Sequence, residues 1–394
     1  MIPRLYEFST DINDFSHNGL GFFNQCVSCK VHEVLNGEYN LTMEILPTDR
    51  LAETVIPDLC ILAKPNYTDP PQIFVISNIV ITKDLITITA NHIKSLFFNN
   101  MVLGDIEDTG STRHGTPQTV VNAILQHEAL INPQPFTFTS DINDEKDFVY
   151  GATETTFGEI FTNDRDGLLR VYGGDLYFNN FSVQLLEHRG EDAVDNKAKY
   201  TIRYGVNLEN MRQELSSENV YTHLLPYAKV PTQRDYTGDI SAVKLYGTEP
   251  QTSNHLIRIN PDESAFTRIL PVDFSKKFTK KAGYVDPSAT SLADSHYPEN
   301  RRVIWSDGLF YADRHEKISM STATITVNYE SNVPDFEKYQ LGDVVRVINS
   351  KMNYNKLHRV VETTYDCLNN RYEKVTIGDR KLSFYTYLKE VLSR

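Results

Sequence analysis

The amino-acid sequence predicts a mainly β protein with α+β insertions, on three observations. Stretches of alternating apolar and polar residues, typical of half-buried strands, fill both ends of the chain. Tyrosine (22) and phenylalanine (20), which suit pleated sheets, are abundant. The segments 56–92 and 341–379 also show the same order of strands, loops and turns, which predicts two related β-domains.

The bulk composition is that of an ordinary soluble globular chain: 394 residues, 40 % hydrophobic and 23 % charged. No stretch reaches the ~18 consecutive apolar residues of a membrane span, and the start MIPRLYEF lacks the features of a signal peptide. We therefore expect synthesis in the cytoplasm and no stable membrane insertion. The net charge of −13 argues against nucleic-acid binding, and the basic run Lys276–Lys281 is interpreted as a solvated loop.

The first hundred residues are expected to form strands. Asn36-Gly37 is a strong hairpin signal between two alternating runs, QCVSCKVHEVL and YNLTMEILP. Three further strands are predicted at LCILAKP, QIFVISNIVIT and DLITITANH. A short apolar helix is predicted at HIKSLFFNNM.

The next block changes character and predicts two helices and a hairpin. Thr116 is placed as the N-cap of a helix that begins at Pro117, and Thr155 or Thr156 caps a second, short helix at TTFGEIF. GLLRVYG follows, with Asp166-Gly167 as its turn signal. The stretch YGGDLYFNNFSVQLLEHRG then predicts a β-hairpin with its turn at Asn179-Asn180. KYTIRYG is interpreted as a strand and NLENMRQEL as a short helix.

The last part predicts an insertion followed by a return to strands. Residues 231–300 are rich in Pro, Ser, Thr, Asp and Gly but keep recurring apolar residues, so they are interpreted as an insertion rather than a disordered linker. Four strands follow at TATITVNYE, DVVRVI, LHRVVETTYDC and RYEKVTIG. A small amphipathic helix is predicted at FYTYLKEVL, within 381–394.

The segments 56–92 and 341–379 are candidates for two copies of one β-module. Each has a short apolar strand, a polar loop with an Asn-Tyr, a long strand, a tight turn and a short alternating strand. The alternative is that any two antiparallel meanders look alike. If the copies are related, Val344, Val345, Val347, Val360, Val361, Val375 and Ile377 are expected to occupy the core positions of Leu59, Ile61, Leu62, Val75, Ile76, Ile86 and Ile88.

The motifs that could carry chemistry are weak. Three His-Glu pairs, at His32, His127 and His315, lack the second histidine that a zincin needs four residues later. The acidic stretch from Asp141 to Asp147 resembles a calcium loop but has Lys146 where an EF-hand needs Gly. Gly173-Gly174 is interpreted as a turn that uses positive φ rather than as a ligand cradle.

The four cysteines are interpreted as ordinary thiols. Cys26 and Cys29 are three apart on a strand and are expected to point to opposite faces, while Cys60 and Cys367 have no close cysteine in sequence. No catalytic, cofactor-binding or metal-binding residue is therefore assigned. Paired carboxylates for glycoside cleavage carry no sequence signature, so they stay open.

An ordered set of segments resembles the phage tail-associated lysin, or prophage endopeptidase-type tail, family. GLLRVYGGDLYFNNFSVQLLEHRGEDAVDN and YTIRYGVNLENMRQELSSENVYTHLLPYAKV look like its central signature. LNGEYNLTMEILP, QIFVISNIVI and ITANHIKSLFFNNMV resemble its first β-domain, and LGDVVRVI with VTIGDR resembles its closing segment. The resemblance covers most of the chain and is weakest in 231–300.

The resemblance implies a fold like the hub of contractile tails, with two related tube-like β-domains, of barrel or sandwich type, plus two peripheral lobes. The expected boundaries are 1–103 for the first β-domain, 104–198 for an inserted lobe, 199–232 with 320–380 for the second β-domain, 233–319 for a second lobe, and 381–394 for the C-terminal helix.

The resemblance also implies a role in the virion. It implies a homotrimeric baseplate hub at the tail tip of a long-tailed, non-contractile phage, below a hexameric distal tail protein. Receptor-binding proteins and the tape-measure protein are further expected neighbours. DNA is expected to pass through the channel at ejection without specific binding. Longer family members carry a cell-wall-degrading domain after this region, whereas this chain ends at Arg394, so we expect no enzyme. A cell-wall-degrading glycosidase or peptidase and a host-surface carbohydrate-binding module are the alternatives.

Overall fold

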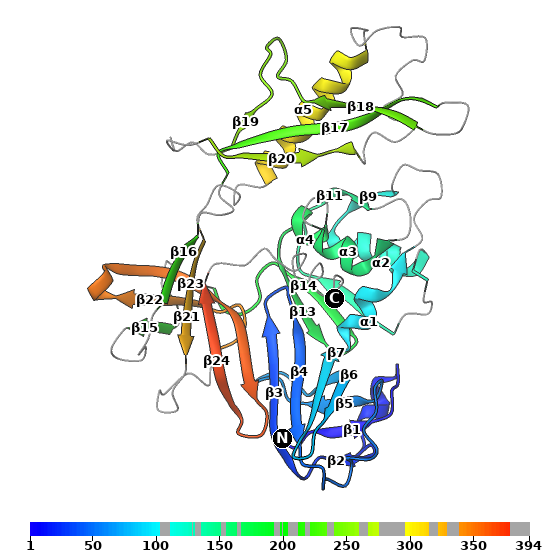
Figure 1. Ribbon diagram of the computed structural model, residues 1–394, viewed down its shortest axis with the longest axis vertical. Helices are drawn as coiled ribbons and strands as arrows, with labels where there is room; N and C mark the ends of the chain where they lie inside the picture. Colours follow the sequence, from blue (N-terminus) through cyan, green and yellow to red (C-terminus); the bar gives the residue numbers. More distant parts are fainter. Residues whose placement is uncertain are drawn as a thin grey trace.

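Two strand modules and two lobes make up the chain (Figure 1). The computed structural model describes residues 1–102, 111–127, 129–130, 135–150, 155–163, 167–192, 198, 200–203, 212–216, 221–234, 240–259, 267–275, 296–314, 322–328 and 339–378.

The N-terminal module is a five-stranded antiparallel sheet in the order β3-β4-β7-β6-β5. Its strands are β3 (Cys26–Val34), β4 (Tyr39–Ile45), β5 (Cys60–Ala63), β6 (Gln72–Ile81) and β7 (Ile86–His92). Short strands β1 (Arg4–Tyr6) and β2 (Gly21–Phe22) extend the sheet beyond β5, and a 3-10 turn, η1 (Ile12–Phe15), lies between them in the chain. The strands predicted from alternation in this region are confirmed.

The C-terminal module repeats this strand order from separate parts of the chain. Its order is β16-β21-β24-β23-β22, again with antiparallel neighbours. Its strands are β16 (Arg212–Ser216), β21 (Thr322–Asn328), β22 (Val344–Asn349), β23 (Tyr354–Asp366) and β24 (Arg371–Gly378). A sixth strand, β15 (Tyr200–Arg203), adds in parallel to β22, and the 3-10 turn η5 (Ser350–Met352) links β22 to β23. The shared strand order predicted for 56–92 and 341–379 is therefore confirmed.

The two modules also share their pairing register. Corresponding pairs are Cys60–Val75 and Val344–Arg359, Ile76–Ala90 and Val360–Ile377, Leu41–Ala90 and Ile325–Ile377, and Val31–Leu41 and Gln213–Ile325. Both long strands carry a β-bulge directly after Ile76 or Val360. A bulge is a specific local device, so its recurrence at one place in both copies supports a common module rather than a chance likeness of two meanders.

The residue equivalences predicted from the sequence are mostly wrong by one or two positions. Val345 does occupy the place of Ile61, as expected. The register instead makes six residues of the second copy, in order, equivalent to six of the first: Val344, Val347, Val360, Val361, Val375 and Ile377 correspond to Cys60, Ala63, Ile76, Ser77, Ile88 and Ala90. Matching by apolar residue type failed because small or polar residues, Ala63 and Ser77, stand where the second copy has valine.

The modules are not closed barrels in the part of the chain that the structure describes. They join edge to edge, β23 against β3, into one open thirteen-stranded sheet whose main path runs from β16 to β2 (Figure 1). The expectation of tube-like barrels is thus replaced by a mainly β architecture with an open sheet and few helices.

The first lobe packs on the N-terminal module and shares its hydrophobic core. Its helices are α1 (Lys94–Asn99), α2 (Pro117–His127), α3 (Phe157–Thr162) and α4 (Leu168–Val171). Its strands are β8 (Met101–Val102), β9 (Ser111–Gly115), β10 (Thr137–Ser140), β11 (Lys146–Tyr150), β12 (Thr155–Thr156), β13 (Asp175–Asn179) and β14 (Ser182–Leu186). The rings of Phe97, Phe157 and Phe161 pack together where α1 meets α3.

The second lobe has a separate core. A four-stranded sheet packs against one helix. Its elements are β17 (His223–Arg234), β18 (Ile240–Tyr246), β19 (Ile257–Arg258), β20 (Ile269–Asp273) and α5 (His296–Arg314). Buried Leu224, Val230, Leu245 and Ile304 contribute to this core. The predicted second β-domain includes residues 199–232, but β17, which begins at His223, pairs with β18, β19 and β20 of this lobe. The division of the chain into domains stays a prediction.

Several local predictions are confirmed and others are corrected. Thr156 caps α3 with a full capping box, and the Thr116 side chain accepts the backbone N–H of Thr119 at the start of α2. GLLRVYG contains helix α4, directly after the predicted turn at Asp166-Gly167. The end of NLENMRQEL is strand β16 rather than helix. Helix α5 was not expected, and the predicted helix at 384–392 lies outside the described residues.

Candidate functional site

The joint between the two modules brings together strands from opposite ends of the chain. Strand β3 pairs antiparallel with the far half of β23, from Val34 opposite Glu362 to Lys30 opposite Asp366. Backbone bonds extend the joint: Leu35 N–H donates to the Val361 carbonyl and Cys367 N–H to the Cys29 carbonyl, both at 2.9 Å. The joint is therefore a continuous sheet, because backbone donors of one module are satisfied by acceptors of the other.

A buried cation, Arg189, lies beside the joint. Its guanidinium donates to the Glu33 carboxylate of β3 at 2.6 Å, lies 3.8 Å from the Asp69 carboxylate and stacks 4.9 Å from the centre of the Tyr177 ring. Burial works against the charge, but the carboxylate of Glu33, helped by Asp69, outweighs it and raises the pKa of Arg189. Arg189 thus ties the first lobe to the N-terminal module.

A second buried ion pair ties the same lobe to the C-terminal module. Arg359 of β23 donates to the Asp175 carboxylate at 2.7 Å and to the Arg189 carbonyl at 2.9 Å. The backbone N–H of Arg189 also donates to the Asp175 carboxylate, at 2.9 Å. Because Arg189 and Asp175 lie on one hairpin, the two ion pairs clamp both modules to it.

Two glycines let the loops at this clamp approach closely. Gly190 (φ 83°) and Gly342 (φ 96°) both have left-handed backbone conformations. A Cβ added to Gly342 would lie 2.0 Å from the carbonyl oxygen of Arg189. The contact is completed by the Glu191 N–H, which donates to the Asp343 carboxylate at 2.7 Å.

Turns at both ends of the β13–β14 hairpin lock it onto the N-terminal module. The Asn36 carboxamide, at the hairpin turn of β3 and β4, accepts the Leu176 N–H at 2.6 Å. At the opposite turn Asn180 accepts the Ile73 N–H at 2.9 Å and donates its own N–H to the Gln72 side chain at 2.7 Å. Both asparagines have positive φ. The hairpin predicted at YGGDLYFNNFSVQLLEHRG is confirmed, and its contacts make it a brace.

A buried lysine and histidine lie under this brace. The Lys94 ammonium donates to the Gly37 carbonyl and lies 4.9 Å from the centre of the Phe178 ring. Burial lowers its pKa to about 7. The His92 ring stacks on Tyr39 at 4.2 Å and faces the Gln72 side chain at 3.1 Å, and burial lowers its pKa well below the usual value.

Three of the four cysteines converge at one end of the joint. Cys26 and Cys29 were expected on opposite faces, but a β-bulge between Cys26 and Ser28 shifts the alternation. The thiol of Cys29 lies against those of Cys26 and Cys367; their hydrogen bonding, with burial, raises its pKa well above the usual value. A protonated thiol is a poor nucleophile, so this cluster is structural.

The described residues of the His-Glu pairs lie in separate surroundings. His32 faces the Thr364 hydroxyl at 3.4 Å, while its neighbour Glu33 binds Arg189. His127 ends α2. The pair at His315 and the basic run Lys276–Lys281 lie outside the described residues.

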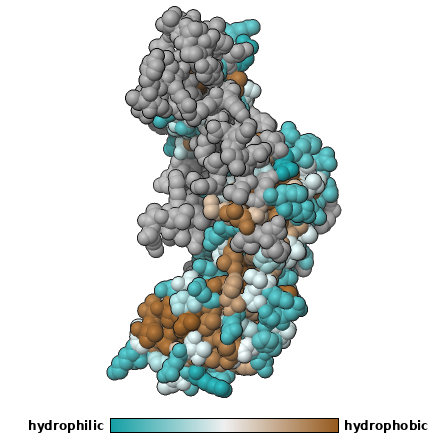
Figure 2. All heavy atoms as spheres, turned by 90° about the vertical axis from the view of Figure 1, so that its right-hand side faces the viewer, coloured by the Kyte–Doolittle hydropathy of each residue, from teal (hydrophilic) through white to brown (hydrophobic). Residues whose placement is uncertain are grey.

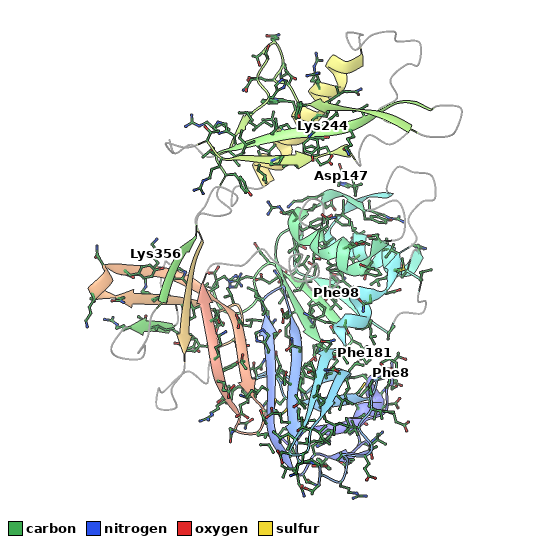
Figure 3. The ribbon with its side chains drawn as sticks, viewed as in Figure 1. Phe8, Phe98, Asp147, Phe181, Lys244 and Lys356 are labelled. Carbon is green, nitrogen blue, oxygen red and sulfur yellow. The ribbon has the colours of Figure 1, made fainter. Side chains whose placement is uncertain are left out.

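The acidic stretch from Asp141 to Asp147 spreads its carboxylates outward. Asp141 accepts the Glu187 N–H at 2.6 Å, and Asp147 lies 2.8 Å from the His114 ring on the periphery of the first lobe (Figure 3). Over the residues with described positions, no group of three or more His, Cys, Asp or Glu side chains is arranged to hold a metal ion. In the same part of the chain no helix is long and apolar enough to cross a membrane.

Gly173 and Gly174 both have positive φ, as predicted from the turn interpretation. A Cβ on Gly174 would lie 2.5 Å from the Leu186 carbonyl oxygen, so close packing against the hairpin explains the second glycine.

The sequence interpretation missed the two buried ion pairs. One signal was available: Glu33 alternates in phase with Cys29 and Val31, which face the core, so a carboxylate on that face required a buried cation. The identity of the partner was not readable, because Arg189 is distant in sequence.

The prophage endopeptidase tail family matches residues 196–387. No curated protein matches the chain. Among solved structures, the chain is similar to the prophage tail protein gp18 of Listeria monocytogenes EGD-e, with 14% identity, a TM-score of 0.55 and 100% coverage of both chains. It is also similar to a tail protein of Neisseria meningitidis MC58, with 9% identity, a TM-score of 0.52 and 97% of each chain covered. The 43 kDa tail protein of prophage MuSo2 from Shewanella oneidensis gives 12% identity and a TM-score of 0.51, covering 97% of this chain and 99% of that one. At these identities the structural likeness establishes the fold.

Proposed function

We propose that the chain, which matches the prophage endopeptidase tail family over residues 196–387 and is similar in fold to prophage tail proteins, is a structural hub at the tip of a long, non-contractile phage tail. The observation that carries this proposal is the repeated module: one chain presents two sheets with the same strand order, the same register and the same bulge. A subunit of this kind suits a ring that has to match a neighbour of higher symmetry.

The symmetry argument sets the number of subunits. A hexameric distal tail ring offers six equivalent surfaces, and three chains with two modules each offer six similar ones. We therefore propose a homotrimer with pseudo-sixfold symmetry below that ring, with receptor-binding proteins and the tape-measure protein as further neighbours. Closure into a ring also covers sheet edges that would otherwise invite aggregation.

The charge of the chain fits a channel through which DNA slides. With a net charge of −13, the chain as a whole repels phosphate. Each lysine or arginine contact to DNA adds salt-dependent affinity, so an ejection channel works best with few of them. In this proposal DNA passes the hub without specific binding.

The charged side chains at the joint favour a structural role over a catalytic one. Glu33 and Asp175 are engaged with Arg189 and Arg359 in buried ion pairs. Both carboxylates are thus occupied by contacts that hold the first lobe to the two modules.

The test is removal of the gene from an inducible prophage, followed by electron microscopy of the particles. We expect particles without a tail tip, or without tails, and restoration of both tips and infectivity by the wild-type gene. Gold-labelled antibody should mark the end of the tail distal to the capsid. Infective particles made without the protein, or labelling confined to the capsid, would refute the proposal.

A further inference from the structure

Strand β6 of the N-terminal module has an edge that its counterpart in the C-terminal module does not leave open. On one side, β7 pairs with β6 along most of its length. On the other side, β5 pairs with Gln72–Val75, and no strand in the described part of the chain pairs with Asn78–Ile81. The far half of β6, Asn78–Ile81, corresponds to Glu362–Tyr365 of β23, and there β3 supplies the missing neighbour.

The strand that would cover this edge by analogy is β16. In the N-terminal module the outermost strand is β3, whose outer side pairs with β23. In the C-terminal module the corresponding strand is β16, which pairs with β21 on its inner side and ends the main path of the sheet on the other. The chain therefore has one completed joint, between β3 and β23. It also has two edges that match the two sides of that joint, on β6 and on β16.

The exposed side chains on β6 also indicate a covered surface. Val80 is 49% exposed and Ile81 is 72% exposed. Exposed edges are usually protected by charge, proline or distortion, and an apolar pair on such an edge is a liability unless a neighbour covers it. Figure 2 shows hydrophobic surface gathered on the part of the molecule that the N-terminal strands build.

We propose that β16 of one copy pairs antiparallel with Asn78–Ile81 of a second copy, reproducing between chains the β3–β23 joint within the chain. Carrying the internal register across places Asn78 opposite Ser216, Ile79 opposite Leu215, Val80 opposite Glu214 and Ile81 opposite Gln213. This inference rests on the proposed ring, and it names the surfaces that close it.

The contact is head-to-tail, so its geometry decides the assembly. A head-to-tail contact makes a closed ring if its rotation closes and a filament if it does not. If the joint between chains repeats the joint within a chain, every module is related to the next by the same rotation. Three chains then close into a ring if that rotation is one sixth of a turn.

Cysteine cross-linking tests the register. The full chain carries Val80→Cys together with Glu214→Cys, in purified protein and in induced particles, and is oxidised mildly. Directly opposite residues in an antiparallel pair lie within the Cα separation that a disulfide spans, so we expect about tenfold more cross-linked product than with either single variant. The cross-linked ladder should end at three chains.

A matched control uses Val27→Cys with Glu214→Cys, because Val27 is exposed to a similar degree (54%) but lies outside the proposed contact. Mixing chains that carry only Val80→Cys with chains that carry only Glu214→Cys should give cross-links between the two kinds of chain. Equal cross-linking with Val27, or none with Val80 in assembled particles, overturns the inference.

A second variant separates this inference from the proposed function. Val80→Lys places a charge on the open edge of β6, at a position that the folded chain leaves exposed. We therefore expect a chain that folds but fails to enter the tail tip, whereas the Val27→Lys chain enters it. Tips that contain the protein and accept Val80→Lys would refute the strand contact and leave the hub role standing. Absence of the wild-type protein from tips would refute the hub role itself.

Discussion

Strands β6 and β23 are the same element of one module in two surroundings. Both begin in a hairpin with a short strand, carry a bulge at one place and continue along a second neighbour. They differ beyond the bulge, where β23 is covered by β3, whereas β6 has no neighbour on that side among the strands that the structure describes. At equivalent positions Tyr365 is fully buried and Ile81 is 72% exposed. The comparison teaches that the fold of a module is set by its own five strands, while its edge residues report what lies next to it.

The largest loss of unfolding free energy is expected at Tyr365, on the part of β23 that β3 covers. Tyr365→Ala should lower the free energy of unfolding by about 3–5 kcal/mol, the usual cost of truncating a buried aromatic side chain. Its ring packs against Tyr67 and Tyr372, and its hydroxyl donates to Asn370. Urea denaturation measures the loss. Tyr365→Phe, which keeps the ring, should lose only about 1 kcal/mol; similar losses in both variants would contradict this account.

Next in size is the clamp between lobe and module. Arg189→Ala leaves Glu33 buried without its cation, which should cost about 3–5 kcal/mol of unfolding free energy. Lys374→Ala is the matched control, because Lys374 pairs with Glu362 at 2.8 Å, close to the 2.6 Å between Arg189 and Glu33, but is 43% exposed. That surface pair should contribute under about 1 kcal/mol. Equal losses by chemical denaturation would show that Glu33 finds another partner.

The close approach of Gly342 to Arg189 gives a third comparison. Gly342→Ala brings a Cβ against the Arg189 carbonyl and also strains a positive φ, so we expect a loss of about 3 kcal/mol. Gly173→Ala, where φ is +79° and the space is open, should lose about 1 kcal/mol from backbone strain alone. Thermal unfolding of both variants measures the difference. A larger loss at Gly173 would disprove the tight contact.

A pH dependence should follow from Lys94. Its pKa is about 7 in the folded chain and near 10.4 when unfolded. Between these values the unfolded chain binds more protons, so the free energy of unfolding rises with pH, by up to about 1.4 kcal/mol per unit. Below pH 7 both states hold the proton and this dependence vanishes.

Lys94→Met isolates that contribution. Relative to this variant, the wild-type protein should gain about 1 kcal/mol between pH 8 and 9 and nothing between pH 5.5 and 6.5. Urea denaturation at each pH gives the comparison. Parallel curves for the two proteins over the whole range would mean that Lys94 keeps an ordinary pKa.

The smallest effect is expected on the open edge. Ile81→Ala should change the unfolding free energy by less than about 0.5 kcal/mol, as surface substitutions usually do. Set against Tyr365→Ala, it measures how far burial alone separates two equivalent positions. A loss above about 2 kcal/mol in dilute solution would mean that a neighbour already covers Ile81 within one chain.

Local signals in the sequence predicted much of the fold. Alternation and Asn36-Gly37 placed the N-terminal strands, and Thr116 and Thr156 marked helix starts, because these features act over a few residues. Strand β16 was predicted as helix, because its strand conformation comes from pairing with the distant β21. The repeat could be predicted from the order of its elements. Its pairing register could not, because it depends on the bulges after Ile76 and Val360, which residue type does not predict.

The joint could be predicted less well than the modules. The phase of Glu33 on β3 indicated a buried cation, yet Arg189 and Arg359 reach the site from distant parts of the chain. Nothing local pairs β3 with β23. The two ion pairs thus depend on tertiary contacts: Arg189–Glu33 needs the first lobe on the N-terminal module, and Arg359–Asp175 needs the C-terminal module as well.

The β3–β23 joint has a consequence for synthesis of the chain. The His32 ring and the Thr364 hydroxyl, which face each other across it, are 332 residues apart. At translation rates of ~5–20 residues per second, β3 waits on the order of tens of seconds with its edge uncovered before β23 leaves the ribosome. A chain that terminates early keeps that edge open and never completes the sheet. We therefore expect chains that terminate before residue 366 to expose this edge to pairing with other chains.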